Sequence, residues 1–237
     1  MGDLTNRVVV ITGAFGALGS SVALAFAAQG ARVALVDIAS STPGPLIKEL
    51  GAAHLFLSNV ELTDLQRTTV AINSVQQRFE RLDVLVSIAG GFRWEKLAEG
   101  SVNTWDEMYS VNLKTAVIAS KAALPHLLAC APGGRIINIG AGAASRMSGA
   151  GMGAYTASKA GVQKLTEALS DEVKDRGITV NAILPGTIDT PRNRKDMPDA
   201  DVARWVTTAA IAEVILFLAS ERAAAITGAA IPVFGRG

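Results

Sequence analysis

The stretch VVVITGAFGALGSSVALAFAA, residues 8–28, decides the fold because it carries no charged side chain and is interrupted by three glycines. An uncharged run of this length directly after Arg7 is also compatible with a signal peptide or a membrane-spanning helix. The glycines argue against both, because they divide the run into pieces that are too short to cross a bilayer. We therefore expect a buried strand at 8–12, a glycine turn, and an alanine-rich helix at 17–29.

Outward from this stretch, short apolar segments alternate with longer helical ones along the rest of the chain. Alternating strands and helices are typical of a parallel sheet that helices cover on both faces. We predict an α/β fold, a doubly wound (Rossmann) parallel sheet of about seven strands, in which residues 1–237 form a single domain. The expected strands are 8–12, 33–37, 54–57, 84–88, 135–139, 179–184 and 229–233, and the expected helices are 17–29, 45–50, 63–81, 104–130, 155–176 and 208–219.

The composition excludes several classes of protein. Of the 237 residues, 49% are hydrophobic and 18% are charged, which is too apolar for a disordered chain. The 22 basic and 21 acidic residues nearly balance, so we expect neither a nucleic-acid nor a membrane partner. The single cysteine, Cys130, cannot form an internal disulfide, and no metal-ligand spacing occurs. We therefore expect a cytoplasmic protein without a metal site.

The glycine turn after the first strand has the context of a dinucleotide-binding fingerprint. Its glycines let backbone N–H groups approach a pyrophosphate, and the start of the following helix favours the negative charge. Asp37 ends the second strand, where a carboxylate can accept hydrogen bonds from a ribose diol and repel a 2′-phosphate. No basic residue follows closely in Ile38-Ala39-Ser40. The sequence therefore predicts NAD(H) in preference to NADP(H).

Further motifs accompany the glycine turn in a fixed order. They are Thr12-Gly13 with Gly19, Asn59-Val60, Ser87-Ile88-Ala89-Gly90, Asn112, Tyr155 with Lys159, Asn181, Pro185-Gly186, Thr190 and Ile226-Thr227-Gly228. In this order and spacing, nearly the whole chain resembles the short-chain dehydrogenase/reductase (SDR) family. Two positions depart from the family pattern, because Ala17 replaces the middle glycine of the turn and Ser87-Ile88 replaces a pair of asparagines.

The resemblance implies which residues bind the nicotinamide cofactor. They are Gly13, Phe15, Gly16, Ala17, Leu18, Gly19, Asp37, Ile38, Asn59, Val60, Ala89, Gly90, Gly91, Tyr155, Lys159, Pro185, Gly186, Ile188 and Thr190. Among them, Thr190 would hold the carboxamide. A short lid at about 186–206 would cover the substrate. This lid has basic residues and Trp205, which suit either an anionic or planar substrate or an ordinary solvated loop.

The resemblance also implies three catalytic residues. Tyr155 and Lys159 lie one turn apart on a predicted helix and so share a face. Tyr155 would be the general acid/base. The Lys159 ammonium, together with the positive nicotinamide of the oxidised cofactor, would lower the pKa of Tyr155, and Lys159 would also hold the nicotinamide ribose. Asn112 would bind a water that continues the proton path.

The serine that usually completes this set is missing. Its position, counted back from the tyrosine, is Gly142, and alignment from the preceding strand gives Ala141 instead. Losing one such hydrogen-bond donor costs ~10²–10³ in rate. Three repairs are open at this point: Ser145 or Ser148 reaches in, backbone N–H groups of residues 140–142 replace the hydroxyl, or the substrate does not need the donor.

The third repair has a precedent in a relative with local resemblance. Dihydropteridine reductase is a short-chain relative that uses NADH and keeps the tyrosine and lysine without the serine. Its glycine turn resembles Gly16-Ala17-Leu18-Gly19 here, and its loop before the tyrosine is likewise rich in alanine and glycine. This resemblance implies a quinonoid pterin, a conjugated and already electrophilic substrate.

We predict an NAD(H)-dependent oxidoreductase that moves a hydride to or from a small carbonyl, alcohol or conjugated ring. The alternative is an NAD(H)-binding sensor or scaffold with little or no catalysis, which the missing serine favours. The long helices expected at 104–130 and 155–176 resemble those that pair across the family's dimer, so we expect a homodimer or homotetramer.

Overall fold

The computed structural model describes residues 4–146 and 148–236. In these ranges, seven parallel strands form one central sheet in the order β3-β2-β1-β4-β5-β6-β9. The strands are β1 (Val8–Thr12), β2 (Arg32–Val36), β3 (Leu55–Leu57), β4 (Val84–Ser87), β5 (Arg135–Ile139), β6 (Thr179–Pro185) and β9 (Ala230–Val233). The prediction of a doubly wound parallel sheet is confirmed, and the strand bounds agree closely with those expected.

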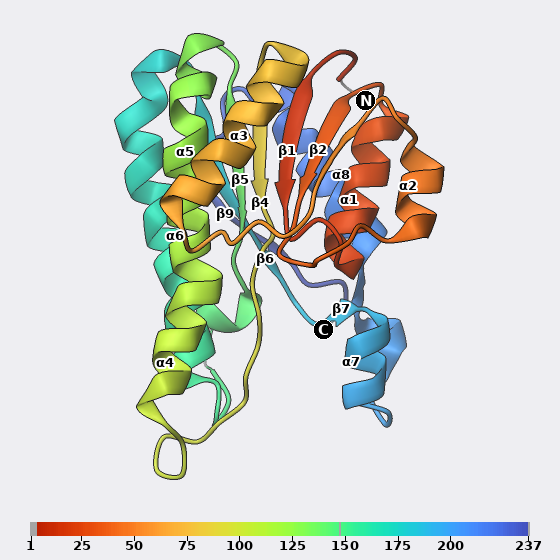
Figure 1. The fold of residues 1–237 in the computed structure, drawn as a ribbon. Helices are drawn as coiled ribbons and strands as arrows, with labels where there is room; N and C mark the ends of the chain where they lie inside the picture. The colour runs from red at the N-terminus through yellow and green to blue at the C-terminus, as the bar shows by residue number, and fades with distance from the viewer. Residues whose placement is uncertain (1–3, 147, 237) are drawn as a thin grey trace.

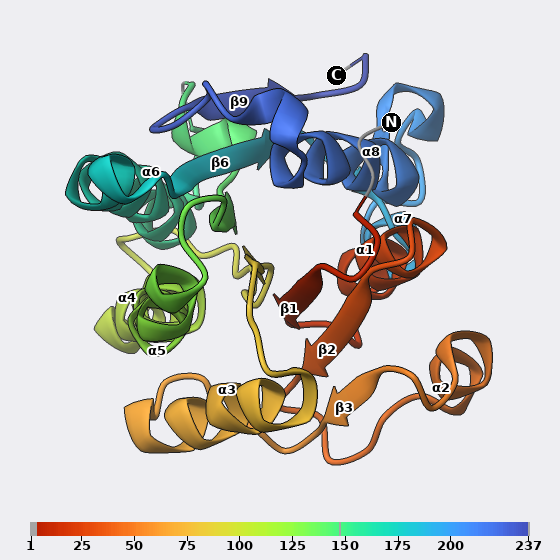
Figure 2. The same cartoon turned by 90° about the horizontal axis from the view of Figure 1, so that it is seen from above.

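Helices cover both faces of the sheet, as the view from above shows (Figure 2). One layer contains α1 (Ala17–Ala28), α2 (Gly44–Leu50) and α8 (Thr208–Ala219), and the other contains α3 (Leu65–Phe79), α5 (Thr115–Ala129) and α6 (Gly153–Val173). Along β1, Val9 and Ile11 pack in the first layer and Val8 and Val10 in the second. Two buried faces explain why the strand reads as a continuous apolar run.

The uncharged stretch 8–28 thus forms a strand, a turn and a helix of the core. In the described part of the chain, no helix is both long and apolar enough to span a membrane. Nor do the described residues include a group of three or more His, Cys, Asp or Glu side chains placed to hold a metal ion.

The helix expected at 104–130 departs from its predicted form. It consists of α4 (Val102–Met108), the π-helical segment η1 (Tyr109–Lys114) and α5. The expected long helix is therefore present over 102–129, and its stretch 109–114 is π-helical. Short π-helical segments inside α-helices are frequently found at functional sites, and this one contains the predicted site residue Asn112. The side chain of Asn112 is bound to other elements on both of its polar atoms, which is a tertiary constraint that hydrophobic periodicity cannot show.

The predicted lid has more regular structure than its sequence suggests. It contains β7 (Ile188–Asp189) and β8 (Val206–Thr207), which pair in parallel, with α7 (Pro191–Asp196) and the short turn η4 (Val202–Arg204) between them. Thr190 caps α7 by accepting a hydrogen bond from the Asn193 N–H. In Figure 1, α7 and α4 extend below the lower ends of the central strands, on opposite sides.

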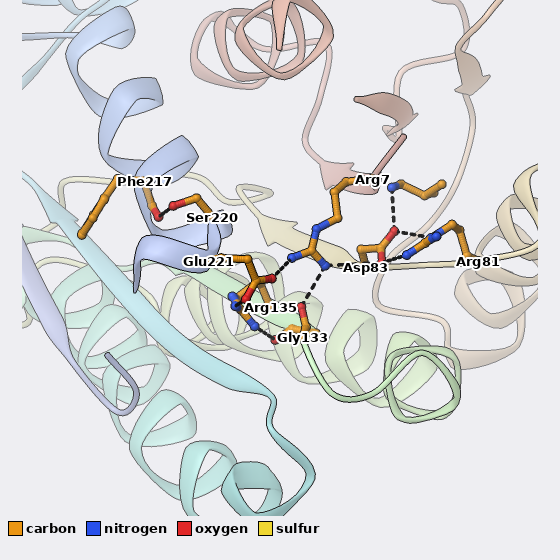
Figure 3. Close-up of polar contacts among 10 residues, drawn as sticks. Arg7, Arg81, Asp83, Gly133, Arg135, Phe217, Ser220 and Glu221 are labelled. Carbon is orange, nitrogen blue, oxygen red and sulfur yellow. Dashed lines mark hydrogen bonds and ion pairs between the residues drawn. The ribbon is translucent and has the colours of Figure 1, made fainter. Parts of the chain in front are cut away.

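The amino ends of the strands carry an ion-pair network that the sequence analysis did not anticipate (Figure 3). Asp83, just before β4, is almost fully buried and accepts hydrogen bonds from the Val8 N–H at 2.8 Å and from Arg81 Nε at 2.8 Å. Arg7 Nη1 lies 3.5 Å from the same carboxylate. Because the buried charge has several donors, the cost of removing it from water is offset.

A second carboxylate extends this network to the next strand. Glu221, which follows α8, pairs with Arg7 and also with Arg135 of β5, whose Nη2 lies 3.3 Å away. Arg135 is buried and Glu221 is exposed. The network therefore links the starts of β1, β4 and β5 to the end of α8.

Candidate active site

A cleft of about 1730 Å³ opens at the carboxyl ends of the central strands. Most of the residues predicted to bind a cofactor line it: Gly13, Phe15, Gly16, Ala17, Leu18, Gly19, Asp37, Ile38, Val60, Ala89, Gly90, Gly91, Tyr155, Lys159, Pro185, Gly186, Ile188 and Thr190. Two predicted site residues, Asn59 and Asn112, are not in its lining. The cleft is larger than a typical drug-sized pocket of roughly 300–1,000 Å³, so it has room for a dinucleotide and a small substrate together.

The glycine turn is packed so tightly that two of its positions have no space for a side chain. A Cβ atom at Gly13, where φ is +63°, would lie 2.8 Å from Ala89 Cα. A Cβ atom at Gly19 would lie 2.3 Å from the Gly13 carbonyl oxygen. The Thr12 hydroxyl oxygen accepts hydrogen bonds from the N–H groups of Ile88 and Ala89, which joins the end of β1 to the end of β4. The turn and the start of α1 are therefore rigid and form a wall of the cleft.

Asp37 is fixed at the edge of the cleft by two backbone groups. Its Oδ2 accepts a hydrogen bond from the Phe15 N–H at 2.9 Å, and its Oδ1 accepts one from the Ala39 N–H at 3.0 Å. The carboxylate is thus oriented by the glycine turn itself. A closed glycine turn at a helix N-terminus together with a held carboxylate is the arrangement that fits a nicotinamide dinucleotide.

Asn59 contributes through its backbone instead of lining the cleft. It has a left-handed conformation with φ of 58°, and its N–H donates to the Ala39 carbonyl at 2.8 Å. The next residue, Val60, lines the cleft and donates its N–H to the Asp37 carbonyl at 2.9 Å. Residues 59 and 60 therefore brace the segment that carries Asp37, and a direct cofactor contact by Asn59 stays a prediction.

Tyr155 and Lys159 both come from the first turns of α6. The Tyr155 ring meets the edge of the Phe92 ring, with centroids 4.9 Å apart. Lys159 is buried, and its Nζ donates a hydrogen bond to the Ile139 carbonyl at 2.7 Å. Burial lowers the pKa of Lys159 from 10.5 to about 8 and raises the pKa of Tyr155 from 10.0 to about 12.

Without a bound cofactor, burial raises the pKa of Tyr155; the expected lowering also required the positive nicotinamide of the oxidised cofactor and stays a prediction. The phenolate would lose water in this enclosed place, and that desolvation disfavours the charged form. The Lys159 ammonium is directed to the Ile139 carbonyl and is itself partly discharged by burial. In this structure Tyr155 is a protonated phenol at neutral pH and has a proton to donate.

Asn112 joins the cleft wall to α6 through its side-chain amide. Oδ1 accepts a hydrogen bond from the Gly91 N–H at 2.9 Å, and Nδ2 donates to the Gly91 carbonyl at 3.1 Å and to Ser158 Oγ at 3.0 Å. A Cβ atom at Gly90 would lie 2.5 Å from Asn112 Oδ1 and 3.3 Å from Lys159 Nζ. Asn112 and Lys159 thus meet across Gly90. Both amide protons are used, so the predicted water would have to bind elsewhere than at Nδ2.

Both candidate positions for the missing serine, Ala141 and Gly142, line the cleft, and an aromatic ring fills the place that a side chain at Gly142 would take. A Cβ atom at Gly142 would lie 2.3 Å from Phe234 Cε1 and 3.0 Å from the Pro185 carbonyl oxygen. Phe234 follows the last strand and lines the cleft. Arg146 also lines the cleft, and its Cζ lies 3.9 Å from the centroid of the Phe234 ring. Sequence reasoning missed Phe234 and Arg146, because neither lies in a motif and the two residues are far apart in the chain.

The hydrogen bonds near the missing serine argue against one of the three replacements and narrow a second. Ser145 Oγ donates to the Gly142 carbonyl at 3.0 Å and Ser148 Oγ to the Ala143 carbonyl at 3.1 Å, and neither serine lines the cleft. The N–H of Gly140 donates to the Ile183 carbonyl at 2.8 Å and is not available to a substrate. What remains is the backbone of residues 141–142 or a substrate with less need of the donor.

Comparisons with known proteins agree with this geometry. A family model described as short chain dehydrogenase matches residues 7–201. The 3-oxoacyl-[acyl-carrier-protein] reductase FabG of Thermotoga maritima is 32% identical, with 98% of each chain covered. The (2S)-[(R)-hydroxy(phenyl)methyl]succinyl-CoA dehydrogenase subunit BbsD of Thauera aromatica is 35% identical, over 98% of this chain and 96% of its own. The crystal structure of carveol dehydrogenase from Mycobacterium avium in complex with NAD matches with a TM-score of 0.88 at 28% identity, and 98% of each chain is covered.

Proposed function

The chain belongs to the short-chain dehydrogenase family, and on that premise we propose that it is an NAD(H)-dependent oxidoreductase acting on a small carbonyl or alcohol. The observation that carries the proposal is one cleft with Asp37 at one part of its wall and Tyr155 with Lys159 at another. The family and its oxidoreductase relatives support hydride transfer as the reaction type.

The proposed preference for NAD(H) rests on the fixed carboxylate of Asp37. Two N–H donors orient it, so it can accept hydrogen bonds from a ribose diol. Its negative charge would repel the 2′-phosphate of NADP(H). The glycine turn and the start of α1 would hold the pyrophosphate, and Thr190 the carboxamide. When bound, the cofactor supplies or accepts the hydride and, in its oxidised form, adds a positive charge to the site.

The proton chemistry falls to Tyr155. With its pKa raised to about 12, the phenol is protonated at neutral pH and can act as the general acid that protonates a carbonyl oxygen during reduction. Lys159, with a pKa of about 8, is mostly protonated at neutral pH, and its positive charge stabilises negative charge that develops near it. Asn112 and its bonds to Gly91 and Ser158 keep the wall next to Lys159 in place.

A second candidate function is favoured by the Phe234 ring at the serine position. Without that hydroxyl, a conjugated imine-like acceptor such as a quinonoid dihydropterin, which is already electrophilic, suits the cleft better than a simple ketone. The missing serine also favours a third function, an NAD(H)-binding sensor or scaffold with little catalysis, which the experiment below tests.

The proposed function is tested by following NADH oxidation with a broad carbonyl panel that includes quinonoid dihydropterin. We expect turnover with NADH that Tyr155→Phe reduces by roughly 10²–10⁴-fold. Tyr155→Phe should leave thermal stability unchanged and change NADH binding far less than turnover, which separates chemistry from folding. NADH binding without turnover of any panel member would identify the sensor instead, and activity unaffected by Tyr155→Phe would refute the assigned mechanism.

We also propose that the protein is a homodimer or homotetramer in the cytoplasm. Large side chains on the outer face of α4, η1 and α5 are solvent-exposed in the single chain, among them Trp105 at 39% and Tyr109 at 52%. Covering such groups is a common reason for closed symmetric assembly. Light scattering that gives a monomer would contradict the proposal.

A further inference from the structure

The contact between Arg146 and Phe234 assigns a substrate class, on the basis of the proposed oxidoreductase function. Phe234 occupies the space that a side chain at Gly142 would need, so a ring excludes a side-chain donor there, and the other candidate position for the serine is Ala141, which has no hydroxyl. Arg146 lies over that ring, 3.9 Å from its centroid, and both residues line the cleft with Tyr155. The site has therefore lost a hydroxyl and gained a guanidinium at the same wall.

Other basic side chains of the cleft are bound to acidic groups or backbone carbonyls, whereas Arg146 contacts an aromatic ring. Arg192 pairs with Asp196 at 3.5 Å, Glu107 pairs with Arg93 at 3.0 Å, and Lys159 is bound to the Ile139 carbonyl. Arg204 donates from Nε to the Arg236 carbonyl at 3.3 Å. Within residues 4–146 and 148–236, Arg146 has neither an acidic partner nor a hydrogen bond, and its recorded contact is the Phe234 ring.

A guanidinium that lies on an aromatic face is preorganised to bind an anion. The ring attracts the cation and limits the directions in which the side chain can point. The N–H donors of the guanidinium lie in its own plane, so stacking one face on a ring leaves them free. Their fork matches the two oxygens of a carboxylate. Because less freedom remains to be lost on binding, such an arginine binds its ligand more favourably than a mobile one.

The platform under Arg146 is itself held in place. The residue before Phe234 accepts a hydrogen bond from the Gly186 N–H at 3.0 Å. Two residues after it, Arg236 donates its N–H to the Arg204 carbonyl at 3.1 Å. The C-terminal segment 233–236 is thus fastened to both ends of the lid, which places Phe234 between the lid and the Gly142 turn.

We propose that Arg146, stacked on Phe234, is a specificity-determining residue that binds the carboxylate of the substrate. The substrate class is then an oxo acid, or the corresponding hydroxy acid in the reverse direction. Such a substrate is held by its carboxylate at Arg146 while its carbonyl faces Tyr155. Anchoring by an ion pair supplies orientation that the missing serine no longer provides.

The test compares reduction by NADH of two oxo acids, 3-oxobutanoate and 4-oxocyclohexanecarboxylate, with reduction of their methyl esters. We expect the wild type to prefer the acids in kcat/KM. Arg146→Met should lower kcat/KM by roughly tenfold to hundredfold on the acids and by less than about threefold on the esters. Arg146→Lys should restore part of the loss, because it keeps the charge without the fork.

Two further variants separate the ion pair from general damage. Arg192→Met removes another cleft arginine, one that already has Asp196 as its partner, and should change the acid-to-ester ratio little. Phe234→Leu removes the platform and should raise KM for the acids more than it changes kcat. Calorimetric titration of each acid and ester into the protein saturated with NAD⁺ gives a readout that does not depend on turnover.

The outcomes distinguish a failure of the proposed anion site from a failure of the proposed oxidoreductase function. If the wild type reduces or binds the esters as well as the acids, or if Arg146→Met lowers both equally, the anion site is refuted while the oxidoreductase function stands. If no carbonyl of any kind is reduced but the acids bind and Arg146→Met abolishes that binding, the anion site stands and the proposed function fails.

Discussion

The two ends of the central sheet use polar side chains in opposite ways. At the amino ends, Asp83 is buried with a full set of donors, including the Val8 N–H and Arg81 (Figure 3). At the carboxyl ends, Lys159 is buried and Tyr155 half-buried, both with few partners, and burial shifts both pKa values so that the neutral forms are favoured. At one end of the strands the buried charges are fully hydrogen-bonded, which favours stability. At the other end the pKa values are perturbed by burial, which is typical of functional sites.

The largest effect is expected when the charge of Asp83, at the centre of the amino-end network, is removed. Asp83→Asn should lower the free energy of unfolding by about 3–5 kcal/mol, because it takes the buried charge from Arg7 and Arg81 and places an amide group against their donors. Urea denaturation measures the change. The carboxyl end should be unaffected, so kcat/KM per folded molecule should stay at the wild-type value.

A matched control for Asp83 is available on the surface. Asp171→Asn removes the exposed partner of Lys174 on α6 and should change stability by less than about 0.5 kcal/mol. Equal losses from both variants would show that the buried network has no special role. A large loss of activity in folded Asp83→Asn would show that the two ends are not independent.

The second prediction tests how much the buried Lys159 ammonium at the carboxyl end lowers the free energy of unfolding. The pKa of Lys159 is about 8 in the folded protein and 10.5 without burial, a difference that corresponds to roughly 3 kcal/mol. Between these values the unfolded chain binds the extra proton, so stability must rise with pH. Below pH 8 the folded protein carries the full penalty.

The comparison with a neutral residue makes this window measurable. Lys159→Met should be more stable than the wild type at pH 7, and its advantage should shrink as the pH rises from 8 to 10. Lys164→Met, an exposed position on the same helix, should show no such window. Measurements stop at pH 10 because Tyr155, with its pKa of about 12 in the fold, then begins to act in the opposite direction. A difference between Lys159→Met and wild type that does not change with pH would contradict the assigned burial effect.

The third prediction uses two neighbouring glycines with different surroundings. In Gly90→Ala the new Cβ would lie 2.5 Å from Asn112 Oδ1, which must move together with Lys159, so kcat/KM should fall by about 10²-fold. In Gly91→Ala the nearest atom is Val111 Cγ2 at 3.5 Å, an ordinary contact, and activity should stay within a few-fold of wild type. Steady-state kinetics of the pair measures whether Asn112 and Lys159 act as one unit; similar rates in both variants would show that they do not.

Sequence reasoning reached the carboxyl end and missed the amino end, for a physical reason. Glycine turns and the Tyr155–Lys159 pair are local patterns, and parallel strands bring them to one edge of the sheet. The contact of Asp83 with Arg7 and that of Phe234 with Gly142 join segments far apart in the chain, and no local pattern records them. The hydrogen bonds of Asn112 in the π-helical segment likewise join it to Gly91 and Ser158, which lie far from it in the chain.

The smallest expected effect comes from the outer carboxylate of the same amino-end network. Glu221 pairs with the buried Arg135, and loss of a partner for a buried cation argues for a large effect. Three facts oppose this: the Glu221 side chain is 71% exposed, Arg135 Nη1 keeps its bond to the Gly134 carbonyl, and the amide oxygen of glutamine can still accept.

The exposure decides the outcome, because water screens this half of the network as it cannot screen Asp83. Glu221→Gln should therefore cost about 1 kcal/mol or less in urea denaturation, with a loss that shrinks as salt is added. A loss as large as that of Asp83→Asn would mean that Arg135, and not Asp83, is the charge on which the amino ends of the strands depend.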